Sequence, residues 1–302
     1  MADIAYDAVS LATTSPLVLT DVKPRAKAIA LTARLYAPSE GAAPYPAVVI
    51  SHGLGNETMA REQRYASLLN QNGFAALFID SFAARRSARW PGAFRQLVVT
   101  EAMMLADAFA ALRSLTVRDE IDPARIAIAG FGEGGTTAVL SAYAQIAQLF
   151  APCGARFSSH VSYWALTAPR LVDVTTTGAP IALLNGALDT GASLARAELI
   201  AGDLQLGGSP VESVVFPYTG RCWDIDDQQP HPHGFNLANL ALQIRPDHTT
   251  VDERRGAAVR GLTTRLITLA RAARTSTVLG EHDEEVSAQS DQILLRHVHG
   301  SN

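Results

Sequence analysis

The sequence has few cysteines, little net charge and no long apolar run. Its 302 residues include two cysteines, Cys153 and Cys222. They are far apart in the chain, so we expect reduced thiols rather than a disulfide. The net charge of −4 is spread along the chain and offers no basic surface to nucleic acid or to an anionic membrane. No stretch is long enough to span a bilayer, and the first residues lack the features of a signal peptide. We therefore expect a cytoplasmic globular protein that binds neither nucleic acid nor membrane.

Short apolar runs alternate with stretches of helical spacing. The runs predict strands at 26–37, 47–50, 74–79, 125–129, 158–164, 181–185 and 211–216, and the spacing predicts helices at 62–72, 96–115, 136–149, 193–206 and 251–274. This alternation predicts an α/β fold with a doubly wound, mostly parallel sheet and helices on both faces. Ligands then bind beyond the carboxyl ends of the strands.

Three parts of the chain are expected. Residues 1–25 read as a partly ordered lead-in, 26–274 as one α/β domain, and 275–302 as a polar tail that is either mobile or docked on a neighbour. Within the domain, residues 217–250 are irregular and rich in Asp, His and Pro. Such a long irregular stretch suggests a functional loop.

The most informative stretch is the glycine-rich turn Gly130-Phe131-Gly132-Glu133-Gly134-Gly135. A β-branched run precedes it and an alanine-rich helical stretch follows, which is the context of the nucleophile elbow G-x-S-x-G of α/β-hydrolases. The flanking glycines suit a sharp turn where strand and helix approach closely. The central position, however, is Gly132, which has no side chain. The turn matches neither a P-loop nor G-x-G-x-x-G, so nothing indicates nucleotide binding.

Around this turn the chain resembles the dienelactone hydrolase family of α/β-hydrolases. The similarity covers roughly residues 28–225, and its pieces occur in the family's order: Pro46-Ala47-Val48-Val49-Ile50-Ser51-His52-Gly53, Asp80-Ser81-Phe82, Asp122-Pro123-Ala124-Arg125-Ile126, the turn itself, and Asn185-Gly186-Ala187-Leu188-Asp189. The resemblance implies an α/β-hydrolase fold for residues 26–274. It also implies hydrolysis of small esters and lactones by a Cys or Ser nucleophile, an Asp and a His.

Two of these three positions depart from the family pattern. Asp189 matches the expected Asp, but Gly132 stands at the nucleophile and Arg221 falls where the His belongs. A second alignment takes His233 as the base, with an insertion of about a dozen residues after the last strand, as long functional loops allow. Glycine cannot attack a carbonyl, so covalent hydrolysis through this position is excluded.

The resemblance leaves an oxyanion hole in place, because backbone N–H groups form it. By analogy these groups belong to Glu133 and to the loop near Leu54. The Glu133 side chain is interpreted as a first-turn residue that the helix dipole favours. His52 is either a base or, more in keeping with its place, a histidine that holds its loop. His231 and His233 lie near acidic residues, which makes a metal conceivable, but a solvated polar loop is the favoured interpretation; we predict no metal and no cofactor.

Further side chains are candidates for binding the substrate. Arg85, Arg86 and Arg221 could bind a carboxylate bidentately, although Arg85 and Arg86 could equally be surface charges. The three aromatic candidates line the pocket or simply pack in the core: Phe82, Trp164 and Trp223.

Three functions remain open at this point. One is a divergent enzyme that acts on a small carbonyl, lactone or ester compound by non-covalent acid–base chemistry, such as cyclisation, elimination, isomerisation or hydration. Another is an ester or lactone hydrolase whose Ser or Cys was replaced by Gly, although one replacement would not explain Arg221. The third is a non-catalytic pseudoenzyme that binds a ligand or serves as a scaffold. The expected partner is a small carbonyl compound, and a homodimer is left open.

Overall fold

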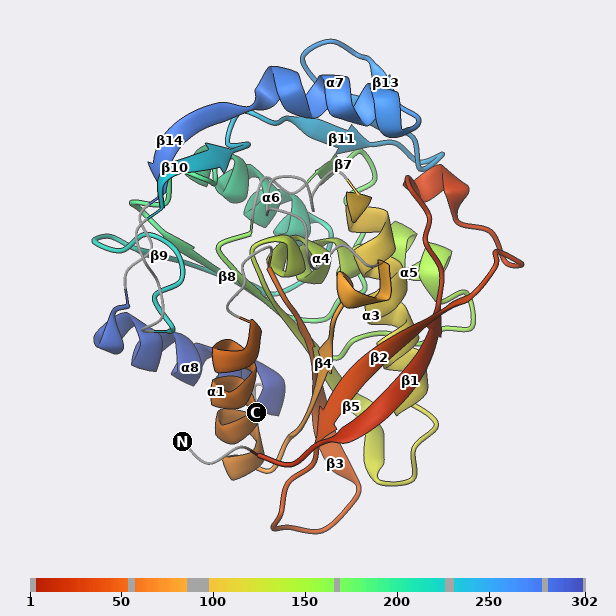
Figure 1. Ribbon diagram of the computed structural model, residues 1–302, viewed down its shortest axis with the longest axis vertical. Helices are drawn as coiled ribbons and strands as arrows, with labels where there is room; N and C mark the ends of the chain where they lie inside the picture. The colour runs from red at the N-terminus through yellow and green to blue at the C-terminus, as the bar shows by residue number, and fades with distance from the viewer. Residues whose placement is uncertain are drawn as a thin grey trace.

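The computed structural model describes residues 4–53, 58–85, 98–165, 169–225, 231–278 and 282–300, with backbone alone for 58, 231–235 and 275–278. Its centre is an eight-stranded sheet in the order β1-β2-β4-β3-β5-β6-β8-β9 (Figure 1). The strands are β1 (Asp7–Thr13), β2 (Ile29–Tyr36), β3 (Tyr45–Ser51), β4 (Ala75–Ile79), β5 (Ile121–Phe131), β6 (His160–Tyr163), β8 (Ile181–Gly186) and β9 (Val211–Phe216). The six strands β4, β3, β5, β6, β8 and β9 are parallel to one another, and β2 is antiparallel to both β1 and β4. The predicted doubly wound, mostly parallel sheet is confirmed.

Each face of the sheet is covered because successive strand residues point to opposite sides. Val49 and Ile128 belong to one core cluster, with helices α3, α4, α5 and α6, whereas Ile50 and Phe131 belong to the other, with α1 and α8 (Figure 1). The described helices are α1 (Thr58–Gln71), α3 (Glu101–Leu115), α4 (Glu133–Ser141), α5 (Ala144–Phe150), α6 (Leu194–Leu206), α7 (Leu262–Ala272) and α8 (Glu284–His299), with short turns η1 (Leu19–Asp21) and η2 (Ala83–Arg85). None of these described helices is long and apolar enough to cross a bilayer.

Both ends of the chain take part in the fold. The expected lead-in contributes β1, which pairs with β2 along seven residues. The expected tail contains α8, whose Ile293, Leu294 and Val298 are buried against the sheet. The apolar residues at the C-terminus therefore dock on the sheet of their own chain.

Two predicted helices are wrong in their extent. The stretch 136–149 forms two helices, because Tyr143 is fully buried and bridges to Thr176 between them. The stretch 251–274 begins instead with two short strands, since Gly256 allows a tight turn at φ +65° whose N–H bonds Asp252 O. Only its second half is helical, as α7.

Residues after β9 form small sheets rather than an irregular loop throughout. Strands β13 (Ala258–Val259), β12 (Thr250–Asp252), β11 (Leu242–Ile244) and β7 (Arg170–Leu171) make one sheet, and β10 (His231–Asn236) pairs with β14 (Arg274–Val278). Together with α7 they lie beyond one end of the main sheet, at the top of Figure 1. Pairing of β11 with β7, which follows β6, attaches this part to the carboxyl edge of the main sheet.

Candidate functional site

The backbone at Gly132 forms a sharp turn between β5 and α4. Gly132 has φ +56° and ψ −111°, a conformation that residues with a side chain adopt only under strain. Its N–H donates to Tyr163 O at 2.9 Å, and its carbonyl accepts from Thr136 N at 2.9 Å. The turn is therefore held from the neighbouring strand and from the helix, and it has the strained geometry of a nucleophile elbow.

The glycines around Gly132 are required for a different reason. A Cβ on Gly130 would lie 2.0 Å from Gly134 O, and a Cβ on Gly134 would lie 2.0 Å from Ser51 O. At Gly132 itself a Cβ would meet only Gly53 Cα and Trp164 Nε1, both at 3.8 Å. The flanking positions are closed by backbone packing, whereas the central position has room for a side chain that the chain lacks.

Asp189 follows β8 and is held by Arg221, which follows β9. Arg221 Nε and Nη2 each donate to the Asp189 carboxylate at 3.1 Å, and Gly191 N donates to it at 2.8 Å. Burial lowers the pKa of the Arg221 guanidinium, but the charge and hydrogen bonds of Asp189 outweigh it and raise the pKa. Arg221 stays a cation and cannot act as a base. Asp189 fills the Nε–Nη2 edge of the guanidinium, and the bidentate binding of a substrate carboxylate by Arg221 stays a prediction.

The alternative base, His233, has no described side chain, so its candidacy stays a prediction. The same holds for His231. Leu54, the second expected oxyanion donor, lies outside the described residues. Among the side chains that the structure does describe, no group of three could hold a metal ion.

His52 holds the loop that follows β3. Its Nε2 accepts from Ser81 N at 3.0 Å and its Nδ1 lies 2.8 Å from Gly53 O. Because Nε2 accepts, the proton is assigned to Nδ1, and the ring is neutral. The ring also packs on Phe82 at 4.6 Å. Both nitrogens are thus used by the backbone, which favours the structural interpretation of His52 over the catalytic one.

Glu133 is the first residue of α4 and is half-buried. Its Oε2 lies 3.9 Å from the position that a Cβ on Gly53 would take. Its charge also contributes to the raised pKa of Arg221. The Glu133 carboxylate therefore lies between the loop after β3 and Arg221, beside the empty position on Gly132. Sequence reasoning placed the backbone N–H of Glu133 at the site and favoured the helix dipole over catalysis for its side chain; the position of the carboxylate beside Gly53 could not be predicted.

The aromatic candidates separate into one residue at the site and two in the core. Trp164 has φ +33° and its indole nitrogen faces the position of a side chain on Gly132. Trp223 is fully buried and donates from Nε1 to Ser290 Oγ at 3.1 Å. Phe82 is also buried, packed on His52 and on Met103 of α3. Core packing, rather than pocket lining, accounts for Trp223 and Phe82.

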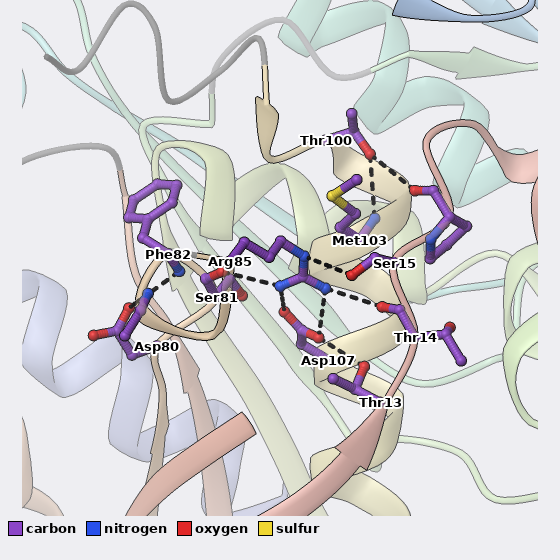
Figure 2. Close-up of polar contacts among 12 residues, drawn as sticks. Thr13, Thr14, Ser15, Asp80, Ser81, Phe82, Arg85, Thr100, Met103 and Asp107 are labelled. Carbon is purple, nitrogen blue, oxygen red and sulfur yellow. Dashed lines mark hydrogen bonds and ion pairs between the residues drawn. The ribbon is translucent and has the colours of Figure 1, made fainter. Parts of the chain in front are cut away.

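Arg85 is neither a substrate-binding residue nor a surface charge, which corrects both predictions for it. Figure 2 shows its guanidinium between the end of β4, the chain after β1 and α3. It donates to the fully buried Asp107 at 2.7 and 3.0 Å, and to the carbonyls of Ser81 and Thr14. A buried carboxylate on α3 needs such a partner, so Arg85 points inward. Arg86 lies outside the described residues.

A small pocket adjoins the elbow on the α1 side of the sheet, with room for roughly one water-sized group. It is lined by Arg34, Ile50, His52, Gly53, Arg61, Glu62, Phe78, Ile79, Asp80 and Phe131. Gly53 borders both the cavity and the empty position on Gly132.

The charged residues of this cavity were missed from the sequence. Arg61 on α1 binds Asp224 at 2.7 and 2.9 Å, and its guanidinium lies 4.8 Å from the ring centre of Phe131. Asp224 was considered only as part of an acidic cluster near the histidines. Arg34 alternates with the buried Leu31, Ala33 and Leu35 of β2, so its place in the sequence does not reveal that it lines a pocket.

Solved structures similar in fold cover almost the whole chain. A protein of Klebsiella pneumoniae assigned as a dienelactone hydrolase has 16% identity and a TM-score of 0.57, with 98% of this chain and 99% of that one covered. A dienelactone hydrolase-like promiscuous phosphotriesterase from metagenomic libraries has 17% identity, a TM-score of 0.57 and 98% coverage of both chains. Thermogutta terrifontis esterase 2, phosphorylated by paraoxon, has 18% identity and a TM-score of 0.52 over 76% of this chain and 88% of that one. These likenesses show a common fold.

No curated protein sequence matches the chain. The sequence profile of the dienelactone hydrolase family, in contrast, matches residues 31–229. This range contains β2 to β9, the glycine-rich turn, Asp189 and Arg221. It covers about two thirds of the chain, and the protein therefore belongs to the dienelactone hydrolase family.

Proposed function

We propose that the protein acts on a small carbonyl compound, a lactone or an ester, by acid–base chemistry without a covalent intermediate. One observation carries this proposal: the elbow keeps its strained backbone at Gly132, while Asp189 is bound by Arg221. The scaffold that presents a carbonyl is retained, but the nucleophile is missing and the carboxylate that would orient a histidine is occupied. Ester cleavage through an acyl-enzyme needs both.

The first N–H groups of α4 supply the electrostatic part of this chemistry. A helix leaves its first four N–H groups without partners inside the helix, and they favour a developing negative charge. When a carbonyl oxygen beside Gly132, at the start of α4, accepts hydrogen bonds from these N–H groups, the carbonyl group withdraws electrons more strongly. The protons on the neighbouring carbon are then more acidic.

Glu133 supplies the proton-transfer group in this proposal. Its carboxylate lies beside Gly53 and feels the charge of Arg221. It takes the α-proton of the bound compound, the carbonyl becomes an enolate stabilised at the start of α4, and the same carboxyl group returns the proton. Enolate formation of this kind is the shared first step of isomerisation, elimination and many cyclisations.

The test follows proton exchange, because the final product is not needed to see it. We would incubate the protein with γ-butyrolactone and α-hydroxy-γ-butyrolactone in D₂O and follow deuterium at the α-carbon by NMR. The expected result is exchange by the native protein that falls about 100-fold or more in Glu133→Gln, as for loss of a general base. Glu198→Gln, an exposed glutamate on α6, is the matched control. Exchange that Glu133→Gln leaves intact would remove Glu133 from the mechanism, and no exchange with either lactone would contradict the acid–base proposal.

A second candidate is a carbonyl-binding protein without turnover. The Asp189–Arg221 pair favours it, since the pair neutralises the one triad residue that the chain retains. The two candidates differ in the same experiment. A binding protein would bind a lactone in calorimetry without catalysing exchange.

A further inference from the structure

The register between β2 and β4 places a cation and a carboxylate side by side in the cavity next to the elbow. Arg34 is paired with Phe78, and Asp80 follows Phe78 by two residues. Because strand residues two apart share a face, Asp80 emerges on the same face as Arg34. Both side chains line the cavity, yet they form no ion pair within 4.0 Å in the described structure.

Two nitrogens of the Arg34 guanidinium are hydrogen-bonded to Glu62, and the third has no partner among the described residues. Its Nε and Nη2 donate to Glu62, which also accepts from Tyr36 Oη at 2.8 Å. The hydrogen bonds to Glu62 raise the pKa of Arg34, with burial opposing them. No described residue bonds Nη1, and the side chain is 22% exposed. Arg34 thus presents fixed donors to the cavity.

In the same way, one carboxylate oxygen of Asp80 accepts hydrogen bonds and the other has no partner among the described residues. Its Oδ1 accepts from Phe82 N at 3.1 Å and from Ala83 N at 2.9 Å, which orients the carboxylate. Among the described residues Oδ2 has no partner, and the side chain is 27% exposed. Asp80 thus presents a fixed acceptor beside the donors of Arg34.

The charges of the lining disfavour an anionic ligand. Arg34 is paired with Glu62 and Arg61 with Asp224, which leaves Asp80 as the lining charge without an oppositely charged partner among the described contacts. A carboxylate in this cavity would face the uncompensated charge of Asp80. A hydroxyl group accepts one hydrogen bond and donates another, so it satisfies both open groups at once. The remaining walls are apolar and suit a carbon skeleton: Ile50, Phe78 and Phe131.

We propose that this cavity is the specificity subsite for a hydroxyl group of the substrate, which accepts from Arg34 Nη1 and donates to Asp80 Oδ2. The assignment rests on the proposed function, because it takes the carbonyl end of the same molecule to lie across Gly53 at the elbow. The substrate class is then a neutral, hydroxylated carbonyl compound, such as a hydroxylactone. A lactone that carries a carboxylate in place of the hydroxyl is disfavoured.

The test compares two probes that differ by one hydroxyl. Calorimetry would measure binding of α-hydroxy-γ-butyrolactone and of γ-butyrolactone to the full-length protein. The hydroxylated probe is expected to bind about tenfold tighter, as for one hydrogen bond to a charged group. Asp80→Asn should abolish this preference, since the amide can keep Oδ1 for Phe82 N and Ala83 N but replaces the open acceptor by a donor.

Asp122→Asn is the matched control, because Asp122 accepts from the backbone of Ala124 in the same kind of turn at the opposite edge of the sheet. It should retain the full preference. Equal affinity for the two probes, or a preference that survives in Asp80→Asn, overturns the subsite while leaving the acid–base proposal standing. A preference that depends on Asp80 without deuterium exchange supports the subsite and contradicts the proposed chemistry. Binding of neither probe overturns the subsite.

Discussion

The elbow and the acid–base end of the site have diverged in different ways. At the elbow the backbone is retained in detail, from the strained Gly132 to the closed packing of Gly130 and Gly134, and only a side chain is missing. At the other end, after β8 and β9, Asp189 is retained but its partner is Arg221, and new bonds join the two. The first region has the backbone of an elbow with glycine at its centre, whereas the second is defined by an ion pair between two side chains.

The difference shows what each region depends on. The elbow is dictated by close backbone contacts, because Gly134 packs against Ser51 and so joins α4 to β3. Its shape survives without a nucleophile. The orientation of a catalytic carboxylate depends instead on its partner, and a buried Asp189 needs one. Arg221 fills that need as a cation.

The largest expected effect comes from breaking the elbow itself. In Gly134→Ala the new Cβ would lie 2.0 Å from Ser51 O, a backbone atom that cannot move alone. We expect a loss of about 4 kcal/mol or more in the free energy of unfolding, measured by urea denaturation. Gly202→Ala is the control, since nothing lies within 4 Å of its Cβ on α6, and it should gain about 0.5–1 kcal/mol. Equal stability of the two variants would show that the elbow is not closely packed.

The next largest effect is expected when the Asp189–Arg221 ion pair is removed. Arg221→Met leaves Asp189 buried, with Gly191 N as its remaining donor among the described contacts. Loss of one partner of a buried pair costs about 3 kcal/mol, measured by the same denaturation. Arg296→Met is the control, because Arg296 pairs with Glu212 at the surface and should cost less than about 1 kcal/mol. A similar small cost for Arg221→Met would mean that the pair does not define this end of the site.

Much of the main sheet could be predicted from the sequence because its strands are short apolar runs and the connections between its parallel strands are helical. The elbow was predicted from its glycines, which directly follow a strand-like run and precede a helical stretch in the sequence. Partners far apart in the sequence could not be predicted. Arg61 and Asp224 are separated by 163 positions, and nothing in the spacing of α1 reveals that its polar side chains reach the chain after β9.

Arg85 shows a second limit. It stands in a polar stretch after β4 and was interpreted as a binding residue or a surface charge. Its position is decided by Asp107, a single carboxylate on an otherwise apolar helix, α3. A charge on the buried face of a helix is visible in the sequence, but the sequence does not show which of several arginines pairs with it. The side-chain composition of the site was therefore less predictable than its backbone.

A third prediction concerns a variant with a hydroxyl nucleophile at position 132 and a histidine at position 221. Gly132→Ser places a Cβ with adequate space but strained backbone, at a cost of up to about 3 kcal/mol. Alone it should not hydrolyse p-nitrophenyl acetate, because Arg221 cannot accept the proton of the hydroxyl. Gly132→Ser with Arg221→His should gain about 100-fold or more over the single variant, as for an added general base. Gly132→Ala with Arg221→His carries the same strain without the hydroxyl and should stay inactive; an active single Ser variant would place the base elsewhere.

The smallest expected effect is on the pH dependence of the free energy of unfolding, which should differ between variants in the two regions. Beneath α4, His160 is fully buried and Nδ1 contacts Ala138 O and Ser141 Oγ, both at 3.1 Å. Burial lowers its pKa to about 4, and the bond to Ala138 opposes the shift. Below the unfolded pKa of about 6.5 the unfolded chain binds more protons than the folded chain. The free energy of unfolding therefore decreases as the pH is lowered, until the pH reaches about 4. This group alone should cost about 2 kcal/mol between pH 7 and pH 5. His160→Asn should flatten that slope and Arg221→Met should not; an unchanged slope in His160→Asn would assign the acid sensitivity to another part of the molecule.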